Sequence, residues 1–183
     1  MNGTLNYSSG ILQLRGSEIL DLTPFAKVNL NSIFIVNNTG DAHLALSGAN
    51  FTTSDDYYIR IQLTEYHRAR SVEKSSTPGG DNLPVVVDLR EGALSDGGEN
   101  TNLDINDIRI VEIADTKRPV PLAVHINYEN GIVRVSADES IDVNGTSPLM
   151  GTVNLGKIIV SEEGVISSGF NLSGGAVAGF QTP

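Results

Sequence analysis

The sequence predicts an all-β chain, a β-sandwich or jelly-roll-like fold that is mostly antiparallel and has extended terminal arms. Apolar and polar residues alternate with a period of two along many segments, which is typical of strands with one buried face. Turn sequences such as Glu129-Asn130-Gly131 separate these segments, and Asn and Gly tolerate the positive φ that tight hairpins need. No window shows a capped apolar stripe with the 3.6-residue period of a helix.

The first third of the chain contains several short alternating segments. Strands are predicted around Ile11, Val28, Phe34 and Leu44. Residues 17–22 are predicted to form one short turn of helix.

The segment from Tyr57 to Tyr66 shows clear alternation, with Ile59, Ile61 and Leu63 predicted to share an inward face. A loop over residues 68–82 is expected to follow it. His67, Arg68, Arg70 and Lys74 form the main basic cluster and are interpreted as a solvated strand end. His67 beside Glu65 is interpreted as a surface pair rather than a metal site, because a catalytic zinc needs three protein ligands.

The second half of the chain predicts further strands and one hairpin. Residues 83–89 form a continuous apolar run, which favours a strand that is covered on both faces. Strands are also predicted around Ile110 and over residues 152–160. A hairpin is centred on Asn130-Gly131. Its predicted inward-facing residues are Leu122, Val124, Ile126 and Tyr128, with Val133 and Val135 on the return strand.

These elements predict three parts. Residues 1–56 form a β segment that packs on or extends the sandwich, and residues 57–160 form the sandwich core. Residues 161–183 form a Gly- and Ser-rich arm. Small, uncharged residues of this kind favour an arm that orders against a neighbour.

Composition excludes several classes of function. The 183 residues include 22 acidic and 12 basic residues, for a formal net charge of -10, and no Cys or Trp. Zero Cys excludes disulfide scaffolds, thiolate zinc sites and cysteine nucleophiles. The acidic balance argues against nucleic-acid partners, which require Lys and Arg against phosphate, and against anionic membranes. No signal peptide or transmembrane segment is predicted.

One acidic loop is a candidate calcium site. Calcium prefers six to eight oxygen ligands from flexible loops. The loop over residues 90–107 offers the carboxylates of Asp96, Glu99, Asp104 and Asp107. The alternative is a solvated loop whose Asp and Asn side chains bind their own backbone. No other cofactor is predicted.

The order of motifs over residues 57–137 resembles a known module. Residues 57–63 supply an alternating strand, Leu83-Pro84-Val85 a second, and Asp107-Ile108-Arg109 a third. This order is similar to a β-sandwich module of unassigned function that accompanies concanavalin-like lectin domains in secreted and phage proteins. The module carries a Trp in its closing strand where this chain has Arg134. The resemblance implies a sandwich and surface recognition, and it carries over no catalytic residue.

The sequence therefore predicts a non-enzymatic structural protein of a phage virion, made in the host cytoplasm. A capsid decoration protein or a tail-associated adaptor is expected, which binds a major capsid or tail protein and forms a homo-oligomer. Sheet edges and terminal arms are the predicted contacts, because exposed backbone readily pairs with other chains.

The alternative is a carbohydrate-binding module that recognises a surface glycan. Sugars stack on exposed aromatic side chains among a few polar groups. The candidates for partner or glycan contact are Tyr66, Tyr128, Phe170 and Phe180. An enzyme is not expected, since the chain shows no nucleophile elbow, metal triad or distinct acid pair.

Overall fold

The computed structural model describes residues 1–37, 43–141, 153–161 and 169–177. Contacts divide the chain into two compact units, Met1–Ser140 and Ile141–Pro183. The first unit holds a large sheet, one α-helix and a separate hairpin. No described helix is long and apolar enough to cross a membrane.

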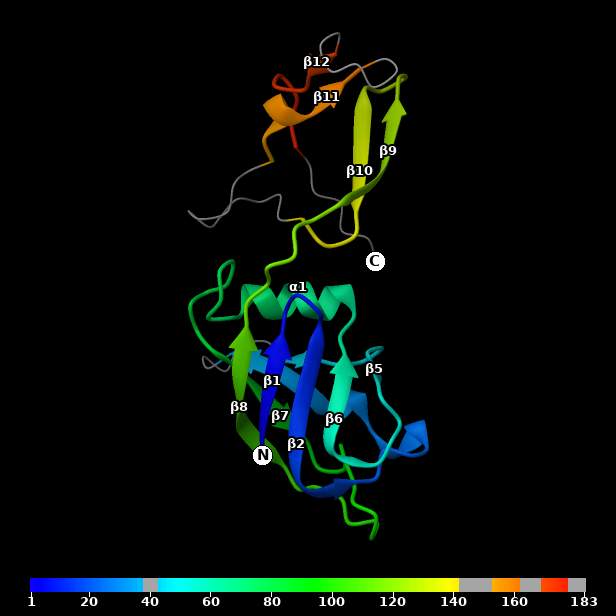
Figure 1. The fold of residues 1–183 in the computed structure, drawn as a ribbon, viewed down its shortest axis with the longest axis vertical. Coiled ribbons are helices and arrows are strands. Elements are labelled where there is room, and N and C mark those ends of the chain that lie inside the picture. The colour runs from blue at the N-terminus through cyan, green and yellow to red at the C-terminus, as the bar shows by residue number, and fades with distance from the viewer. Residues whose placement is uncertain (38–42, 142–152, 162–168, 178–183) are drawn as a thin grey trace. The chain divides into compact units, whose positions relative to one another are not determined.

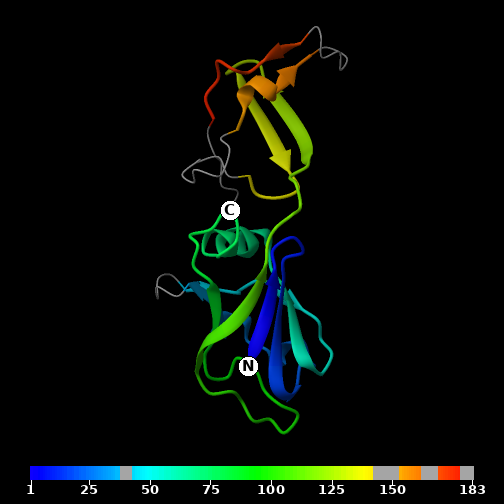
Figure 2. The ribbon, with the colours of Figure 1, turned by 60° about the vertical axis from the view of Figure 1, so that its left-hand side comes forward.

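Eight strands of the first unit form one mixed sheet (Figure 1). Their order across the sheet is β4 (Leu44–Ala45), β3 (Ile33–Asn37), β7 (Val85–Leu89), β8 (Ile105–Ile113), β1 (Asn2–Asn6), β2 (Ile11–Leu20), β6 (Asp56–Gln62) and β5 (Asn50–Phe51). All neighbours are antiparallel except β1 and β8, which run parallel and lie side by side in Figure 2. Strands from both sides of residue 56 therefore share one sheet.

The prediction of an all-β chain is confirmed, since the described structure is mostly strands with few helices and contains a large curled sheet. The strands pair continuously as one mixed sheet rather than as two separate layers. The sandwich or jelly-roll arrangement therefore stays a prediction.

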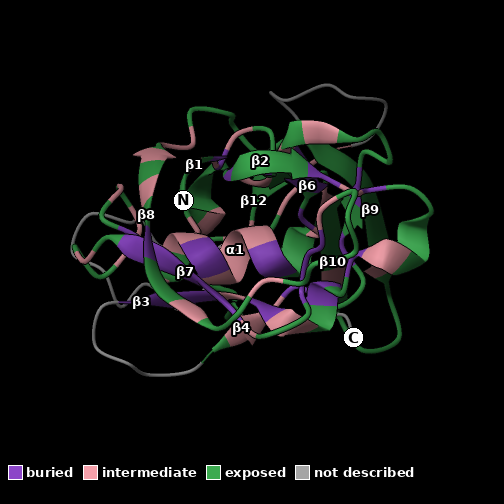
Figure 3. Cartoon of the chain, turned by 90° about the horizontal axis from the view of Figure 1, so that it is seen from below, coloured by how far each residue is buried: buried purple, intermediate pink, exposed green. Residues whose placement is uncertain are grey.

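The core lies on one face of this sheet, where the alternating pattern predicted it. Ile59 and Ile61 are fully buried and Leu63 nearly so, which confirms their shared inward face. Their sheet partners Leu12 and Leu14 are also fully buried. The five residues of β7, including Asp88, are all buried, which confirms the predicted strand with both faces covered (Figure 3).

One helix was not expected. Residues Glu65–Glu73 form α1, where the sequence suggested a strand end and a loop. Thr64 caps its N-terminus by accepting from the backbone N–H of His67, and Glu65 lies in the first turn, where a negative charge is favourable. Its buried residues are the polar His67 and Ser71, so no apolar stripe marks the helix in the sequence.

Three other local predictions are wrong. Residues 17–20 continue β2 instead of forming a helical turn. Two short 3-10 helices, η1 (Phe25–Lys27) and η2 (Leu30–Ser32), flank Val28 in place of a strand. Within the predicted strand 152–160, the described part holds the 3-10 helix η3 (Leu155–Lys157) and the short strand β11 (Ile159–Val160).

The predicted hairpin is confirmed. Strands β9 (Pro121–Asn127) and β10 (Ile132–Ala137) pair antiparallel, with Val135 opposite Val124 and Val133 opposite Ile126. Gly131 turns the chain with a φ of 68°, a conformation that favours glycine. The hairpin forms a two-stranded sheet of its own.

The second unit contributes a small described part. β11 pairs antiparallel with β12 (Phe170–Asn171), and the backbone N–H of Leu172 donates to the carbonyl of Ile158 at 3.1 Å. The predicted terminal arm begins at residue 161, and most of it lies outside the described residues.

Candidate functional site

The hairpin carries an exposed apolar face. Because paired residues of antiparallel strands point to the same side, the register places Leu122, Val124, Ile126, Val133 and Val135 on one face. Leu122 is 67% exposed and Val124 57% exposed, while Val135 is 39% exposed. The predicted grouping of these residues is right. The predicted burial is wrong for Leu122, Val124 and Val135, whereas Ile126 and Val133 are half-buried.

The edges of the two sheets differ in a way that matters for pairing. The large sheet ends at β4 and β5, each only two residues long. Short edge strands offer few free backbone groups to another chain. β9 and β10 are seven and six residues long, and each has one neighbour in the described sheet. The longest open edges among these elements therefore flank the apolar face.

Arg68 connects the segments that precede and follow the hairpin to helix α1. Its guanidinium Nη1 donates to Asp115 Oδ2 at 2.5 Å and its Nη2 to Glu139 Oε2 at 3.3 Å. Asp115 precedes β9 and Glu139 follows β10, so one side chain holds the two chain segments together. The Nε of Arg68 donates to Glu65 Oε2 at 2.6 Å within α1. We call Arg68, Glu65, Asp115 and Glu139 the base clamp.

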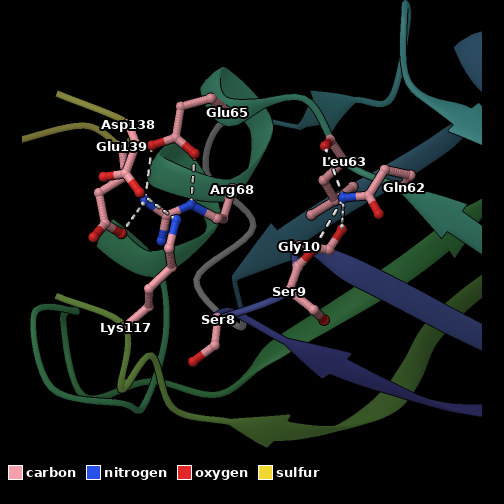
Figure 4. Close-up of a pocket in the computed structure, with 10 residues that line it drawn as sticks. All are labelled: Ser8, Ser9, Gly10, Gln62, Leu63, Glu65, Arg68, Lys117, Asp138 and Glu139. Carbon is pink, nitrogen blue, oxygen red and sulfur yellow. Dashed lines mark hydrogen bonds and ion pairs between the residues drawn. The ribbon is translucent and has the colours of Figure 1, made fainter. Parts of the chain in front are cut away.

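A second pair supports the same place. Lys117 Nζ lies 2.6 Å from Asp138 Oδ2, and Asp138 Oδ1 accepts from the backbone N–H of Val120. The backbone N–H of Ser140 donates to Glu65 Oε1 at 2.6 Å. Figure 4 shows Arg68 reaching between Glu65 and the two acidic residues that follow β10. The residues that make these contacts line a small polar pocket. The Ser8–Gly10 turn, Gln62 and Leu63 line the rest of it.

Burial and hydrogen bonding shift the pKa values of the two glutamates in the base clamp in opposite directions. The Glu139 side chain is 7% exposed, and its Oε1 is buried with no hydrogen-bond partner among the described residues. Burial raises the pKa of Glu139 above its ordinary value, against the opposing charge of Arg68. Burial would also raise the pKa of Glu65, but its hydrogen bonds from Arg68 and Ser140 outweigh this and lower it. The arrangement suits a structural junction, since both cations of the pocket are already paired.

The structure does not gather the four predicted calcium ligands. Asp96 Oδ1 accepts from the backbone N–H groups of Gly98 and Asn100, both at 2.8 Å. Glu99 lies 3.5 Å from Lys27 Nζ, as an exposed ion pair. Over the described ranges, no group of three or more His, Asp or Glu residues could hold a metal ion. The loop matches the alternative, in which acidic side chains bind their own backbone.

The remaining acidic candidates lie on different parts of the loop and on β8. Asp104 Oδ1 accepts from the backbone N–H of Glu91 at 2.7 Å. Asp107 lies in β8 with a φ of 58°, a left-handed conformation that Asp tolerates. Neither residue belongs to a group of three or more possible metal ligands in the described part of the chain.

The predicted aromatic contacts lie on separate elements. Tyr66 is 61% exposed on α1, where the guanidinium carbon of Arg70 lies 5.8 Å from its ring centre. Tyr128 is 89% exposed beside the hairpin turn. Phe170 is exposed on β12 in the second unit, and Phe180 lies outside the described residues. Within the first unit, Tyr66 and Tyr128 therefore lie on separate elements, α1 and the hairpin turn.

Sequence reasoning missed the base clamp for an identifiable reason. The basic cluster around Arg68 was interpreted as solvated, but the Arg68 side chain is only 11% exposed. His67 is buried rather than on a strand surface, and its Nδ1 lies 2.9 Å from Thr64 Oγ1. The signal that could have revealed this was Thr64 followed by Glu65, which is typical of a helix start.

Comparison with known proteins adds little. No family model matches the sequence, and no curated protein matches it significantly. A solved structure, described as a thermostable esterase, is similar over 72% of this chain and 40% of its own, with 13% identity and a TM-score of 0.38. That similarity is too low to carry over a fold or an activity. The resemblance to the lectin-associated module stays a prediction.

Proposed function

We propose that this chain is a non-enzymatic assembly protein that binds a neighbouring subunit through the apolar face of the β9–β10 hairpin. The observation that carries the proposal is the exposure of Leu122 and Val124 on a strand whose pattern is that of a buried one. An isolated two-stranded hairpin is marginally stable in water. A partner that covers this face would remove apolar surface from water at about 25 cal/mol per Å².

The neighbour that we propose is a second copy of the same chain. Between Pro121 and Ala137 the charged residues are Glu129 and Arg134, so the hairpin is formally neutral in a chain with a net charge of -10. Contact through this neutral face avoids the repulsion that other acidic surfaces would add. Two like faces related by a two-fold axis would cover each other at once, which is the commonest symmetry of homo-oligomers.

The base clamp supports this use of the hairpin. Arg68 ties the segments before β9 and after β10 to α1, which fixes the root of the hairpin. A rigidly held binding element loses less conformational entropy on association than a loose one. The clamp therefore prepares the hairpin for contact.

Sedimentation analysis of the intact chain tests the self-association. We expect a dimer or larger closed oligomer that Val124→Asp converts to a monomer, because a charge on the contact face would be buried without a partner. His125→Asp is the matched control. His125 of β9 lies opposite Arg134 of β10, on the other face of the hairpin from Val124. A wild-type chain that is monomeric at tens of micromolar would contradict the proposal.

As the assembly we propose a phage particle, with the chain as a capsid decoration protein or tail-associated adaptor. The absence of Cys, the acidic balance and the strand-rich body support this proposal. Mass spectrometry of particles purified from the source should detect the chain in stoichiometric amounts. Its absence from such particles would contradict the virion role and leave the oligomer test unaffected.

A further inference from the structure

A second surface lies on the outer face of the large sheet. A shallow groove crosses β8, β1, β2 and β6 on the side away from the core. The lining residues are Asn2, Gly3, Thr4, Gln13, Arg15, Tyr58, Arg109 and Val111. The strand registers explain this grouping, since Asn2 pairs with Arg15 and Arg15 with Tyr58 in one row across three strands.

The groove is basic in an acidic chain. Arg15 and Arg109 are both exposed, and neither forms an ion pair within the described residues. Arg15 lies with its guanidinium carbon 5.9 Å from the ring centre of Tyr58. Arg60 approaches the same ring at 5.6 Å but is paired with Asp56 at 3.2 Å. Two guanidinium groups without an ion pair among the described residues therefore line one groove.

The chemistry of these groups selects an anion with hydroxyl groups. A guanidinium binds a carboxylate with two parallel hydrogen bonds, which is stronger and more directional than binding by an ammonium. Asn2, Thr4 and Gln13 add uncharged amide and hydroxyl groups along the same groove. Such groups pair with the hydroxyl groups of a sugar.

The position of the groove argues against a peptide that is bound as an added strand. β1 lies between β8 and β2, and β2 lies between β1 and β6. These central strands have no free edge to which an extended peptide could add as a further strand. The groove holds about 230 Å³, which is less than the roughly 300–1,000 Å³ of a pocket that encloses a whole small molecule. It suits one ring of a longer ligand.

We propose that this groove binds the carboxylate-bearing sugar residue of an acidic glycan, with Arg15 and Arg109 as the carboxylate ligands. This site is independent of the hairpin and of Tyr66 and Tyr128. The net charge of -10 opposes long-range attraction to a polyanion, so the contact that we propose is a short-range one between the two arginines and a single sugar carboxylate.

A glycan array with the intact chain tests the proposal. It should carry uronate- and sialate-containing oligosaccharides, each beside its neutral methyl-ester counterpart. We expect binding to acidic glycans, at least tenfold weaker binding to their esters, and weaker binding as salt rises, because exposed charge pairs are screened. Absence of binding to every acidic glycan, or equal binding to acid and ester, would overturn the proposal.

Two variants locate the site. Arg15→Gln and Arg109→Gln should each weaken binding of the best acidic glycan about tenfold, as expected for loss of one charge-assisted contact. Arg70→Gln is the matched control, since Arg70 lies on α1, is paired with Glu73 and should leave binding unchanged. Unfolding curves check that the variants fold. Unchanged binding in both groove variants, or tighter binding of a polyglutamate peptide than of any glycan, would overturn the assignment.

Discussion

Strands β2 and β6 and strands β9 and β10 share one sequence pattern but differ in burial. In the first pair, Leu14 and its partner Ile59 are fully buried. In the second, Val124 faces Val135 and both are exposed, by 57% and 39%. Alternation determines which residues share a face of a strand, whereas burial depends on what packs against that face. The hairpin therefore has the sequence pattern of core strands, but its apolar face is exposed.

A matched pair of truncations provides the sharpest test of this comparison. Leu14→Ala should lower the free energy of unfolding by about 2–5 kcal/mol, because it leaves a cavity in a fully buried layer. Leu122→Ala removes the same atoms from a side chain that is 67% exposed. It should change the free energy of unfolding by about 0.5 kcal/mol or less. Urea unfolding of both variants, at a concentration where the chain is monomeric, measures the difference. Equal losses would show that the hairpin face is covered within one chain.

The same comparison shows which parts of the fold could be predicted. The hairpin turn at Asn130-Gly131 and the buried face of β6 are encoded over a few residues, and both were predicted correctly. The parallel pairing of β1 with β8 joins Gly3 to Ile110 across the sequence, and no local pattern specifies such a partner. Helix α1 was missed because it buries polar side chains and so lacks an apolar stripe.

The candidate sites show a similar limit. The acidic residues after Ser95 are close in sequence, which suggested a shared ion, but Asp96 and Asp104 bind separate backbone groups and Glu99 pairs with Lys27. The base clamp joins Arg68 to Asp115 and Glu139, residues separated by 47 and 71 positions. Sequence proximity is a poor guide to such contacts, since long-range pairing brings the groups together only in the folded chain.

The second largest effect is expected at the base clamp. Arg68→Gln leaves Asp115 and Glu139 without their common cation and should lower the free energy of unfolding by about 3 kcal/mol, the low end for breaking a buried ion pair. It should also release the hairpin root, so backbone amides of β9 and β10 should exchange with solvent faster than those of β2. Hydrogen exchange followed by mass spectrometry measures this.

Arg70→Gln serves as the control on the same helix. Its ion pair with Glu73 is exposed on both sides, at 41% and 58%, and such pairs contribute about 0–1 kcal/mol. We expect unchanged exchange in the hairpin. If Arg68→Gln also leaves hairpin exchange unchanged, the clamp does not hold the hairpin.

The smallest effect depends on pH and separates two carboxylates of the clamp. Because burial raises the folded-state pKa of Glu139, its charged form destabilises the folded chain at neutral pH, and this cost disappears as pH falls through that pKa. Glu139→Gln removes this buried charge and should therefore stabilise the chain at pH 7. The gain should shrink as pH falls towards 4.5, the ordinary pKa of this group.

Substitution of Glu65 should have the opposite effect on the stability of the folded chain. Hydrogen bonds from Arg68 and Ser140 hold its pKa below 4.5 despite burial, so its charged form stabilises the folded chain above that pH. Glu65→Gln should destabilise the chain at pH 7, and this loss should also shrink as pH falls through 4.5 and below. Thermal unfolding of both variants between pH 4 and pH 8 measures the two trends. Effects of the same sign at pH 7 would show that the guanidinium of Arg68 does not distinguish the two carboxylates.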